Sequence, residues 1–377
     1  MAQRISQEEG LRLFKEGSLE ELKARAVEIR NEKNPANRVT FVVDSNPNYT
    51  NVCNADCKFC AFYRHKSAKD AYTKNCEEVM EHLQYAKDAG CTTVLLQGGL
   101  HPDLSLDYYT DLVRNAKARF PEINPHFFTA PEIYNCAKVS ECSIRDVLQA
   151  LYDAGQRSLP GGGAEIISER VRQQVSPKKM TQGAWIDIHK TAHQIGFRTT
   201  ATMMYGHVEE PEDILEHLET IRQAQDEIPG FTAFIPWSYK RDRTALRRSV
   251  KNWAGVDAYF RILAFSRIYL DNFDHIQASW FGEGKETGVS ALGYGADDFG
   301  GTILEENVHR ATGFINKANV KGMVDMIRSG GYLPAERNTF YDILRVYKSD
   351  DEVFVPELQK NQEADQVRIL DMATAEV

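Results

Sequence analysis

The stretch Cys53-Asn-Ala-Asp-Cys57-Lys-Phe-Cys60 brings three cysteines together at the spacing C-x3-C-x2-C. Four thiolates complete a structural zinc site or a closed iron–sulfur cluster, whereas three thiolates on a cubane cluster leave one iron without a protein ligand. An open coordination position is where a metal does chemistry, because a small molecule can bind there. The spacing therefore indicates an iron–sulfur cluster with a chemical role.

Two other interpretations of these cysteines are open. Zinc needs a fourth ligand, for which His65 is the nearest candidate, and no second cysteine pair follows downstream. Free thiols that are simply buried are the other possibility, because cysteine is often buried. The remaining cysteines are scattered, and we interpret them as structural: Cys76, Cys91, Cys136 and Cys142.

The composition is typical of a soluble globular protein, with 42% hydrophobic and 26% charged residues among 377 and a formal net charge of −9. No basic stripe interleaved with aromatic residues occurs, so we expect no nucleic acid partner, and the short basic stretch 240–248 is interpreted as a solvated loop. The first 17 residues contain no secretory signal, and no window approaches the ~18 apolar residues of a membrane span, so we expect no membrane partner. Seven cysteines without a disulfide framework indicate a cytoplasmic protein.

Short apolar or β-branched runs alternate with amphipathic helical stretches along most of the chain. The periodicity predicts two short helices over 6–33, with a capping box that begins at Ser18. Further helices are expected over 76–89, 104–119, 144–154, 181–195, 211–225, 255–270 and 316–329. Strands are expected over 40–44, 93–97, 126–129, 157–159, 199–204, 232–236, 275–279 and 290–293.

Eight strands that alternate with helices predict a parallel sheet of the α/β class. Closure into a (β/α)8 TIM-like barrel is the simplest outcome for a chain of this length. We expect an N-terminal helical extension over 1–38, the barrel over 39–347 and a short C-terminal tail over 348–377.

The unusual residues of the chain follow directly after the expected strands. In a (β/α)8 barrel these positions converge on the C-terminal rim, where active sites lie. They are the cysteine stretch, Gln97-Gly98-Gly99, Thr129-Ala-Pro-Glu132, Pro160-Gly-Gly-Gly163 with Glu165, Tyr205-Gly206-His207, Trp237, Trp280 and Asp297-Asp298.

Several of these residues have more than one interpretation. Gln97-Gly98-Gly99 allows a ligand to approach the backbone closely, although such a run is often only a turn. His207 is a candidate substrate contact or general acid–base, with a metal ligand as the alternative. Asp297-Asp298 suits either a divalent cation or substrate hydroxyl groups. An aromatic substrate pocket and an ordinary core are equally consistent with Tyr205, Trp237, Trp280 and Phe299.

The segment over 48–64, Asn-Tyr-Thr-Asn-Val-Cys-Asn-Ala-Asp-Cys-Lys-Phe-Cys-Ala-Phe-Tyr-Arg, resembles the cluster segment of the radical S-adenosylmethionine (SAM) enzymes of the futalosine route to menaquinone. Ser158-Leu-Pro-Gly-Gly-Gly-Ala-Glu165-Ile is shared with their relatives. The stretches 199–207, 231–237, 277–280 and 305–308 are most similar to the cyclases of that route, which form cyclic dehypoxanthinyl futalosine. The chain departs from the cyclase pattern at Lys240-Arg241, Trp280-Phe281 and Asp297-Asp298, near the expected substrate pocket.

The resemblance implies a [4Fe–4S] cluster on Cys53, Cys57 and Cys60, with SAM on the fourth iron as the source of a 5′-deoxyadenosyl radical. It further implies cofactor contacts from residues after the first four strands. Phe59 is expected near the adenine, Gln97, Gly98 and Gly99 at the methionine end, and Thr129, Glu132 and Ser158 at the SAM ribose and carboxylate.

The implied substrate is dehypoxanthine futalosine, from whose ribose the radical abstracts hydrogen before the carbon radical adds to the benzoate ring. The ring then loses an electron and a proton, so a base is needed, for which Tyr63, Tyr205 and His207 are the candidates. An electron donor such as flavodoxin or ferredoxin is implied as a partner. Aminofutalosine synthase and the related radical SAM enzyme of deazaflavin cofactor assembly are alternatives, as is an iron–sulfur electron carrier that is not an enzyme.

Overall fold

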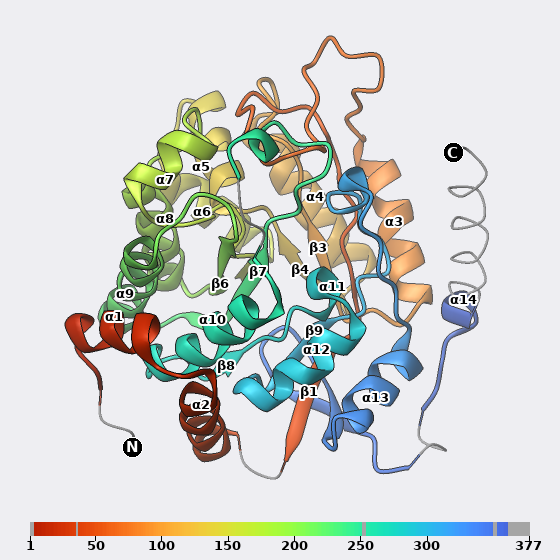
Figure 1. Cartoon of the computed structure of the whole chain (residues 1–377). Helices are drawn as coiled ribbons and strands as arrows, with labels where there is room; N and C mark the ends of the chain where they lie inside the picture. Colours follow the sequence, from red (N-terminus) through yellow and green to blue (C-terminus); the bar gives the residue numbers. More distant parts are fainter. Residues whose placement is uncertain (1–3, 35–36, 251–253, 350–352, 361–377) are drawn as a thin grey trace, which may run out of the picture.

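A ring of parallel strands occupies the centre of the computed structural model, and helices surround it (Figure 1). The structure describes residues 4–34, 37–250, 254–349 and 353–360. The ring has eight strand positions, so the predicted (β/α)8 TIM-like barrel of the α/β class is confirmed. In chain order they are β1 (Arg38–Val42) continued by β2 (Asp44–Ser45), β3 (Thr93–Leu96), β4 (Asn124–Phe127), β5 (Ser158–Leu159), β6 (Arg198–Tyr205), β7 (Phe231–Ser238), β8 (His275–Ile276) and β9 (Asp298–Gly301).

Backbone pairing holds the ring together in groups. β2, β3 and β4 pair in parallel, as do β5, β6, β7 and β8, and β9 pairs with β1. A bridge between Gln277 and Asp298 joins β8 to β9. β4 and β5 meet through side chains, because Asn124 and His126 each form a 2.8 Å hydrogen bond with the Ser158 hydroxyl. The ring therefore encloses a lumen, with a rim at the carboxyl ends of the strands and a base at their amino ends.

The outer helices bury one apolar face each. In α3 (Cys76–Asp88), Asn75 caps the first turn in a reciprocal capping box, and Val79, Met80 and Leu83 are buried as the spacing predicts. The other helices around the barrel are α4 (Leu106–Arg119), α5 (Ala130–Val139), α6 (Ile144–Asp153), α7 (Glu169–Val175), α8 (Gln182–Ile195), α9 (Pro211–Glu227), α10 (Val256–Tyr269), α11 (Trp280–Glu283), α12 (Lys285–Ala291) and α13 (Val320–Ser329).

Two helices precede the barrel, as the sequence predicts for 6–33. α1 (Gln7–Glu16) begins after Ser6 and α2 (Leu19–Lys33) after Ser18, whose hydroxyl accepts a 3.1 Å hydrogen bond from the Glu21 N–H. α1 contacts α9 and α2 contacts α10, so both lie against the outside of the barrel (red in Figure 1). None of the helices in the described part of the chain is long and apolar enough to cross a membrane.

The expected strand over 290–293 is wrong. These residues end α12 and form a short 3-10 turn, and the eighth strand is β9. A four-residue apolar run is too short for periodicity to distinguish helix from strand, and here Ala291 and Leu292 are buried in a helical conformation. Asp297 and Asp298 consequently lie at the beginning of the last strand, at the base of the barrel and away from the rim.

A pair of strands that the sequence did not predict closes the base. β10 (Leu333–Arg337) runs parallel to β1, and β11 (Ile343–Val346) returns antiparallel to β10. Between them, the Thr339 hydroxyl lies 2.6 Å from that of Thr93 and 2.9 Å from the Asn124 amide. The connection between β10 and β11 therefore covers the base of the lumen. Of the expected tail, α14 (Glu357–Lys360) is described, and residues 350–352 and 361–377 lie outside the described part.

Candidate active site

The three clustered cysteines lie in the long connection between β2 and α3, above the rim. Cys53 and Cys57 are buried and Cys60 is half-buried, in a small apolar group with Leu100 and Tyr63. Burial, with smaller contributions from Glu165 and the neighbouring thiols, raises the pKa of the Cys57 thiol to about 12, although Lys179 opposes the rise. A buried thiol of this kind becomes a thiolate when a metal binds it. The three thiols therefore fit a buried metal cluster.

In the described part of the chain, no group of three or more His, Cys, Asp or Glu side chains has the arrangement of ligands around a single metal ion, and this includes the three cysteines. A cubane cluster requires a different arrangement of the thiolates, because each thiolate binds a separate iron. The donor set of three cysteines without a fourth protein ligand fits such a cluster.

The glycines after β3 allow the cysteine connection to sit directly on the rim. A Cβ at Gly99 would lie 2.2 Å from the Val52 carbonyl and 2.7 Å from the Cys53 Cβ. A Cβ at Gly98 would lie 2.6 Å from the Tyr49 ring. Any other residue would push the cysteine connection away from the end of β3, so the two motifs form one site.

Glu132 holds this glycine segment in place through a network of hydrogen bonds. Its Oε1 accepts hydrogen bonds from the Gly98 N–H at 2.9 Å and the Tyr49 hydroxyl at 2.8 Å, and its Oε2 accepts from the Thr129 N–H at 2.8 Å and the Thr129 hydroxyl at 2.6 Å. Burial raises the pKa of Glu132 to about 7, although these hydrogen bonds oppose the rise. Both carboxylate oxygens are occupied, so Glu132 positions the rim, whereas the half-buried Thr129 lies at its edge.

A buried ion pair that the sequence analysis did not identify lies beside the cysteines. Lys179 Nζ donates a 2.7 Å hydrogen bond to Glu165 Oε1 and lies 5.8 Å from the centre of the Phe59 ring. Glu165 Oε2 and the Nε and Nη2 of buried Arg172 have no hydrogen-bond partner among the described residues. Buried polar atoms without partners are rare in folded proteins. This pair and Arg172 therefore form a polar site that suits a charged ligand next to Cys57.

The barrel lumen contains a cavity of about 310 Å³ that extends from the rim to the base. Gln97 and Gly162 line its upper end, and Arg337 and Thr339 line its lower end. The walls are mainly apolar and aromatic, which suits an aromatic ligand and excludes water. The aromatic residues in the walls are Trp237, Trp280, Phe281 and Tyr341.

Ser158, Tyr205 and His207 neither line this cavity nor pack against the cysteines. Ser158 is the first residue of β5 and is bonded to Asn124 and His126 at the base. Tyr205 is buried against Tyr259, with 6.3 Å between ring centres. The His207 side chain has no exposed surface, because its Nε2 bonds the Met204 carbonyl at 2.9 Å and its Nδ1 accepts from the Val208 N–H at 2.8 Å.

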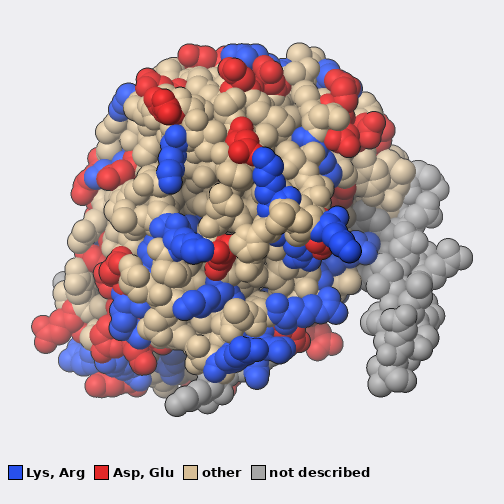
Figure 2. Space-filling model, turned by 90° about the horizontal axis from the view of Figure 1, so that it is seen from above, with Lys and Arg blue, Asp and Glu red and all other residues tan. Residues whose placement is uncertain are grey.

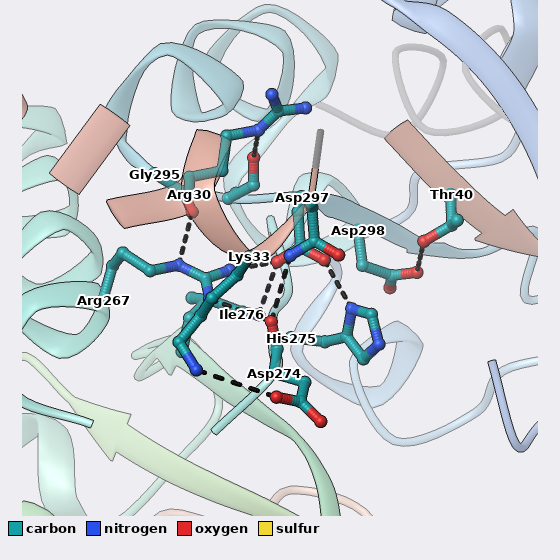
Figure 3. Close-up of polar contacts among 12 residues, drawn as sticks. Arg30, Lys33, Thr40, Arg267, Asp274, His275, Ile276, Gly295, Asp297 and Asp298 are labelled. Atoms are coloured by element: carbon teal, nitrogen blue, oxygen red, sulfur yellow. Dashed lines mark hydrogen bonds and ion pairs between the residues drawn. The ribbon is translucent and has the colours of Figure 1, made fainter. Parts of the chain in front are cut away.

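Asp297 and Asp298 are wrong as candidate ligands for a cation or a substrate, since both carboxylates are buried and paired (Figure 3). Asp297 pairs with Arg267 and, at 2.5 Å, with His275 Nδ1. Asp298 accepts from Arg337 at 2.5 and 2.9 Å and from the Thr40 hydroxyl at 2.7 Å. These pairs connect β1, β9, β10 and α10 at the base of the barrel.

Two family models match the chain: the radical SAM superfamily over residues 47–221 and the CofH/MqnC C-terminal region over residues 228–349. The chain is 41% identical over 346 residues to the cyclic dehypoxanthine futalosine synthase of Halalkalibacterium halodurans, which covers 92% of this chain and 93% of that protein. It is 38% identical over 361 residues to the aminodeoxyfutalosine synthase of Streptomyces coelicolor, covering 93% of each. Methylornithine synthase shares the fold, with a TM-score of 0.68 at 17% identity over 89% of this chain and 95% of that one.

Proposed function

Because the chain belongs to the radical SAM superfamily and carries the C-terminal region of CofH and MqnC, we propose that it converts dehypoxanthine futalosine to cyclic dehypoxanthine futalosine in menaquinone biosynthesis. The observation that carries this proposal is the 41% identity to a synthase of that name along 92% of the chain. The cavity supports it, because an aromatic, closed lumen below the cysteines suits a benzoate-bearing substrate. We also propose that the protein is located in the cytoplasm.

Membership of this superfamily implies a [4Fe–4S] cluster and SAM. When bound, they supply a 5′-deoxyadenosyl radical that abstracts hydrogen from the substrate. Cys53, Cys57 and Cys60 would hold the cluster, because they are the thiols gathered above the rim. No other part of the described chain offers such a group of cysteines.

The chain's own residues would hold SAM around the rim. The Gln97–Gly99 segment, fixed by Glu132, would bind the methionine amino group through its backbone carbonyls, with Thr129 at its edge. Arg172 and Lys179 would balance the charge of the SAM carboxylate, because Arg172 has N–H groups without a partner, Lys179 interacts with Cys57, and the two cations interact with each other. Phe59 would contact the adenine, a proposal supported by its packing against the cysteines and Lys179.

The cavity would orient the substrate with its ribose toward the rim and its benzoate in the lumen. The main contribution of the protein would then be to hold the ribose radical close to its target carbon on the benzoate ring, because the radical must react with no other atom. Phe281 and Trp280, where the sequence departs from the cyclase pattern, line the wall. Lys240 does not line it: its Nζ donates to the Ser238 hydroxyl at 2.7 Å and lies over the Phe314 ring.

We further propose that an acidic one-electron carrier such as flavodoxin or ferredoxin docks on the rim face. Figure 2 shows this face from above, with Lys and Arg side chains gathered over part of it. The Leu246 N–H donates a 2.8 Å hydrogen bond to the carbonyl of Lys58, a residue between Cys57 and Cys60, so the basic stretch 240–248 lies against the cysteine connection. No ion pair in the described structure engages the exposed basic patch of Lys58, Arg241, Arg243, Arg247 and Arg248.

The main alternative is the aminodeoxyfutalosine synthase reaction, because a relative of that name is 38% identical. The test is anaerobic reconstitution of the cluster, followed by separate incubation of the enzyme with SAM, a reductant and the substrate of either reaction. Mass spectrometry should detect 5′-deoxyadenosine together with a product two hydrogens lighter than dehypoxanthine futalosine. Turnover of only the other substrate would reject the proposed cyclase activity, and an intact cluster without 5′-deoxyadenosine would favour an electron carrier.

A further inference from the structure

One acidic side chain in the barrel lumen has no role in the site described above. Asp44 is the first residue of β2, lines the cavity and has only 5% of its surface exposed. Its Oδ1 accepts a 2.7 Å hydrogen bond from the Ile303 N–H. Its Oδ2 accepts none from the described residues, and it is not among the fully enclosed atoms that lack a partner. The carboxylate therefore presents one free oxygen to the contents of the cavity.

The backbone around Asp44 holds this carboxylate in place. Gly301 provides the space, because a Cβ there would lie 2.1 Å from each carboxylate oxygen. The Thr302 hydroxyl bonds both the N–H and the carbonyl of Asp44 at 3.0 Å. Ile303 has a φ of +48°, a left-handed conformation that is strongly disfavoured for a β-branched residue and costs about 1–3 kcal/mol. Strain of this kind persists where the surrounding structure fixes a functional group.

The charge environment of Asp44 is mixed. Burial raises the pKa of Asp44 to about 7, with the Ile303 N–H and Arg337 opposing the rise and Asp298 adding to it. The buried thiol of Cys91 is the other titratable group that interacts with it. A carboxyl group with a pKa near the working pH both accepts and releases a proton readily.

The other titratable side chains of the cavity are less suited to accept a proton. Burial lowers the pKa of His126 to about 3 and that of His309 to about 4. Glu306 is occupied by the backbone N–H groups of residues 308–310. Arg337, at the base of the cavity, is a cation that is already paired with Asp298. Asp44 therefore remains as the carboxylate with an available oxygen.

We propose, resting on the cyclase function above, that Asp44 is the general base that removes the ring proton after cyclisation. Formation of the carbon–carbon bond leaves the attacked ring carbon tetrahedral, with its hydrogen still attached. That carbon–hydrogen bond would then break, with its proton going to Oδ2 of Asp44. The one-electron oxidant that this step needs is a role that the iron–sulfur cluster, once bound and oxidised by SAM cleavage, would supply. In total the substrate would lose one hydrogen atom to 5′-deoxyadenosine, one proton to Asp44 and one electron to the one-electron oxidant, which together equal two hydrogen atoms.

The test is the variant Asp44→Asn, which retains an acceptor for the Ile303 N–H but cannot act as the base. Wild-type and variant proteins, each with a reconstituted cluster, are compared in single turnovers for 5′-deoxyadenosine, cyclic product and freeze-quenched electron paramagnetic resonance. We expect the variant to form 5′-deoxyadenosine and to accumulate an organic radical, while cyclic product falls roughly 100-fold or more. In the wild type, the pH profile of kcat should rise through about 7, and the variant should lose that rise.

Three outcomes separate the claims. Cyclic product from Asp44→Asn at the wild-type rate, with an unchanged pH profile, overturns Asp44 as the base. Radical accumulation in a His126→Gln variant but not in Asp44→Asn overturns it in favour of the imidazole. Wild-type enzyme that cleaves SAM but forms no cyclic product overturns the proposed cyclase function, and the assignment of Asp44 fails with it.

Discussion

The carboxylate of Glu132 accepts a hydrogen bond from the backbone N–H of Gly98, with 2.9 Å between Oε1 and the nitrogen. This bond connects α5 to the glycine segment on which the cysteine connection rests. Replacement by alanine removes the acceptor of that N–H and of the Thr129 N–H, at a cost of about 1–3 kcal/mol for each unsatisfied group. Glu132 thus acts on the cofactor site through the backbone that it holds.

We therefore expect Glu132→Ala to retain the cluster but to bind SAM about tenfold more weakly, a change of ~1.4 kcal/mol. Equilibrium dialysis of reconstituted protein against labelled SAM measures the dissociation constant. Glu81→Ala, on the exposed face of α3, is the matched control and should bind as the wild type does. An unchanged dissociation constant in folded Glu132→Ala would show that the glycine segment needs no support from α5.

His207 is expected to be a structural residue, against the sequence prediction of a catalytic role. Its two ring nitrogens bond the Met204 carbonyl and the Val208 N–H, and its side chain is fully enclosed. His207→Ala should lower the free energy of unfolding by about 1–3 kcal/mol while turnover per folded, cluster-loaded enzyme stays the same. Urea unfolding and a product assay on the same preparation measure the two quantities. Loss of turnover at full stability would restore the catalytic role.

The stability of the protein should depend on Asp44 in a pH-dependent manner. A carboxyl group whose pKa is raised on folding, here to about 7, stabilises the fold fully below its unfolded pKa, and that contribution is lost as pH rises toward 7. Asn carries no charge at any pH, so Asp44→Asn should gain stability over the wild type, by roughly 3 kcal/mol more at pH 8 than at pH 5. Urea unfolding at both pH values measures the difference. An equal effect at the two pH values would mean that Asp44 is not a buried acid with a raised pKa.

The basic patch should matter only when the electron comes from a protein. Reversing two charges in Arg247→Glu/Arg248→Glu should lower flavodoxin-driven turnover about tenfold at low salt, because steering by opposite charges is lost. Turnover driven by dithionite should be unchanged in the same variant. Arg12→Glu, on exposed α1 at the outside of the barrel, is the matched control. Equal losses with both reductants would place the effect in the active site and reject the docking surface.

Much of the fold and the positions of the candidate site residues on one rim were predictable because the signals are local. The cysteine spacing, Gln97-Gly98-Gly99 and the alternation of strands and helices can each be recognised within a few residues, and a parallel barrel brings the ends of its strands together. The positions of Cys53, Cys57 and the glycines on one rim follow from that topology.

The failures arose where position depends on distant parts of the chain. The strand predicted over 290–293 led to the prediction that Asp297 and Asp298 lie at the rim, whereas they lie at the base. Their partners Arg267 and Arg337 come from other elements, so the sequence around the two aspartates does not show these pairs. Ser158 was expected to contact SAM on the family resemblance, whereas in the structure it begins the two-residue strand β5 and bonds Asn124 and His126 at the base.

No sequence motif marks Asp44, Lys179 or Arg172. Asp44 becomes distinctive only because Gly301 and Ile303 enclose it from a strand more than 250 residues away in the chain. Lys179 and Arg172 become distinctive only because α7 and the segment after it lie beside Cys57. Packing between distant segments created these features, and a single sequence does not display it.

The most direct test of the proposed cyclase function traces the hydrogen at C4′ of the substrate ribose. Dehypoxanthine futalosine carrying deuterium at C4′ of its ribose is incubated anaerobically with the reconstituted enzyme, SAM and a reductant, and both products are weighed by mass spectrometry. The proposed function predicts 5′-deoxyadenosine one mass unit heavier, formed in step with a cyclic product that lacks the deuterium. Unlabelled 5′-deoxyadenosine alongside unchanged substrate would contradict it.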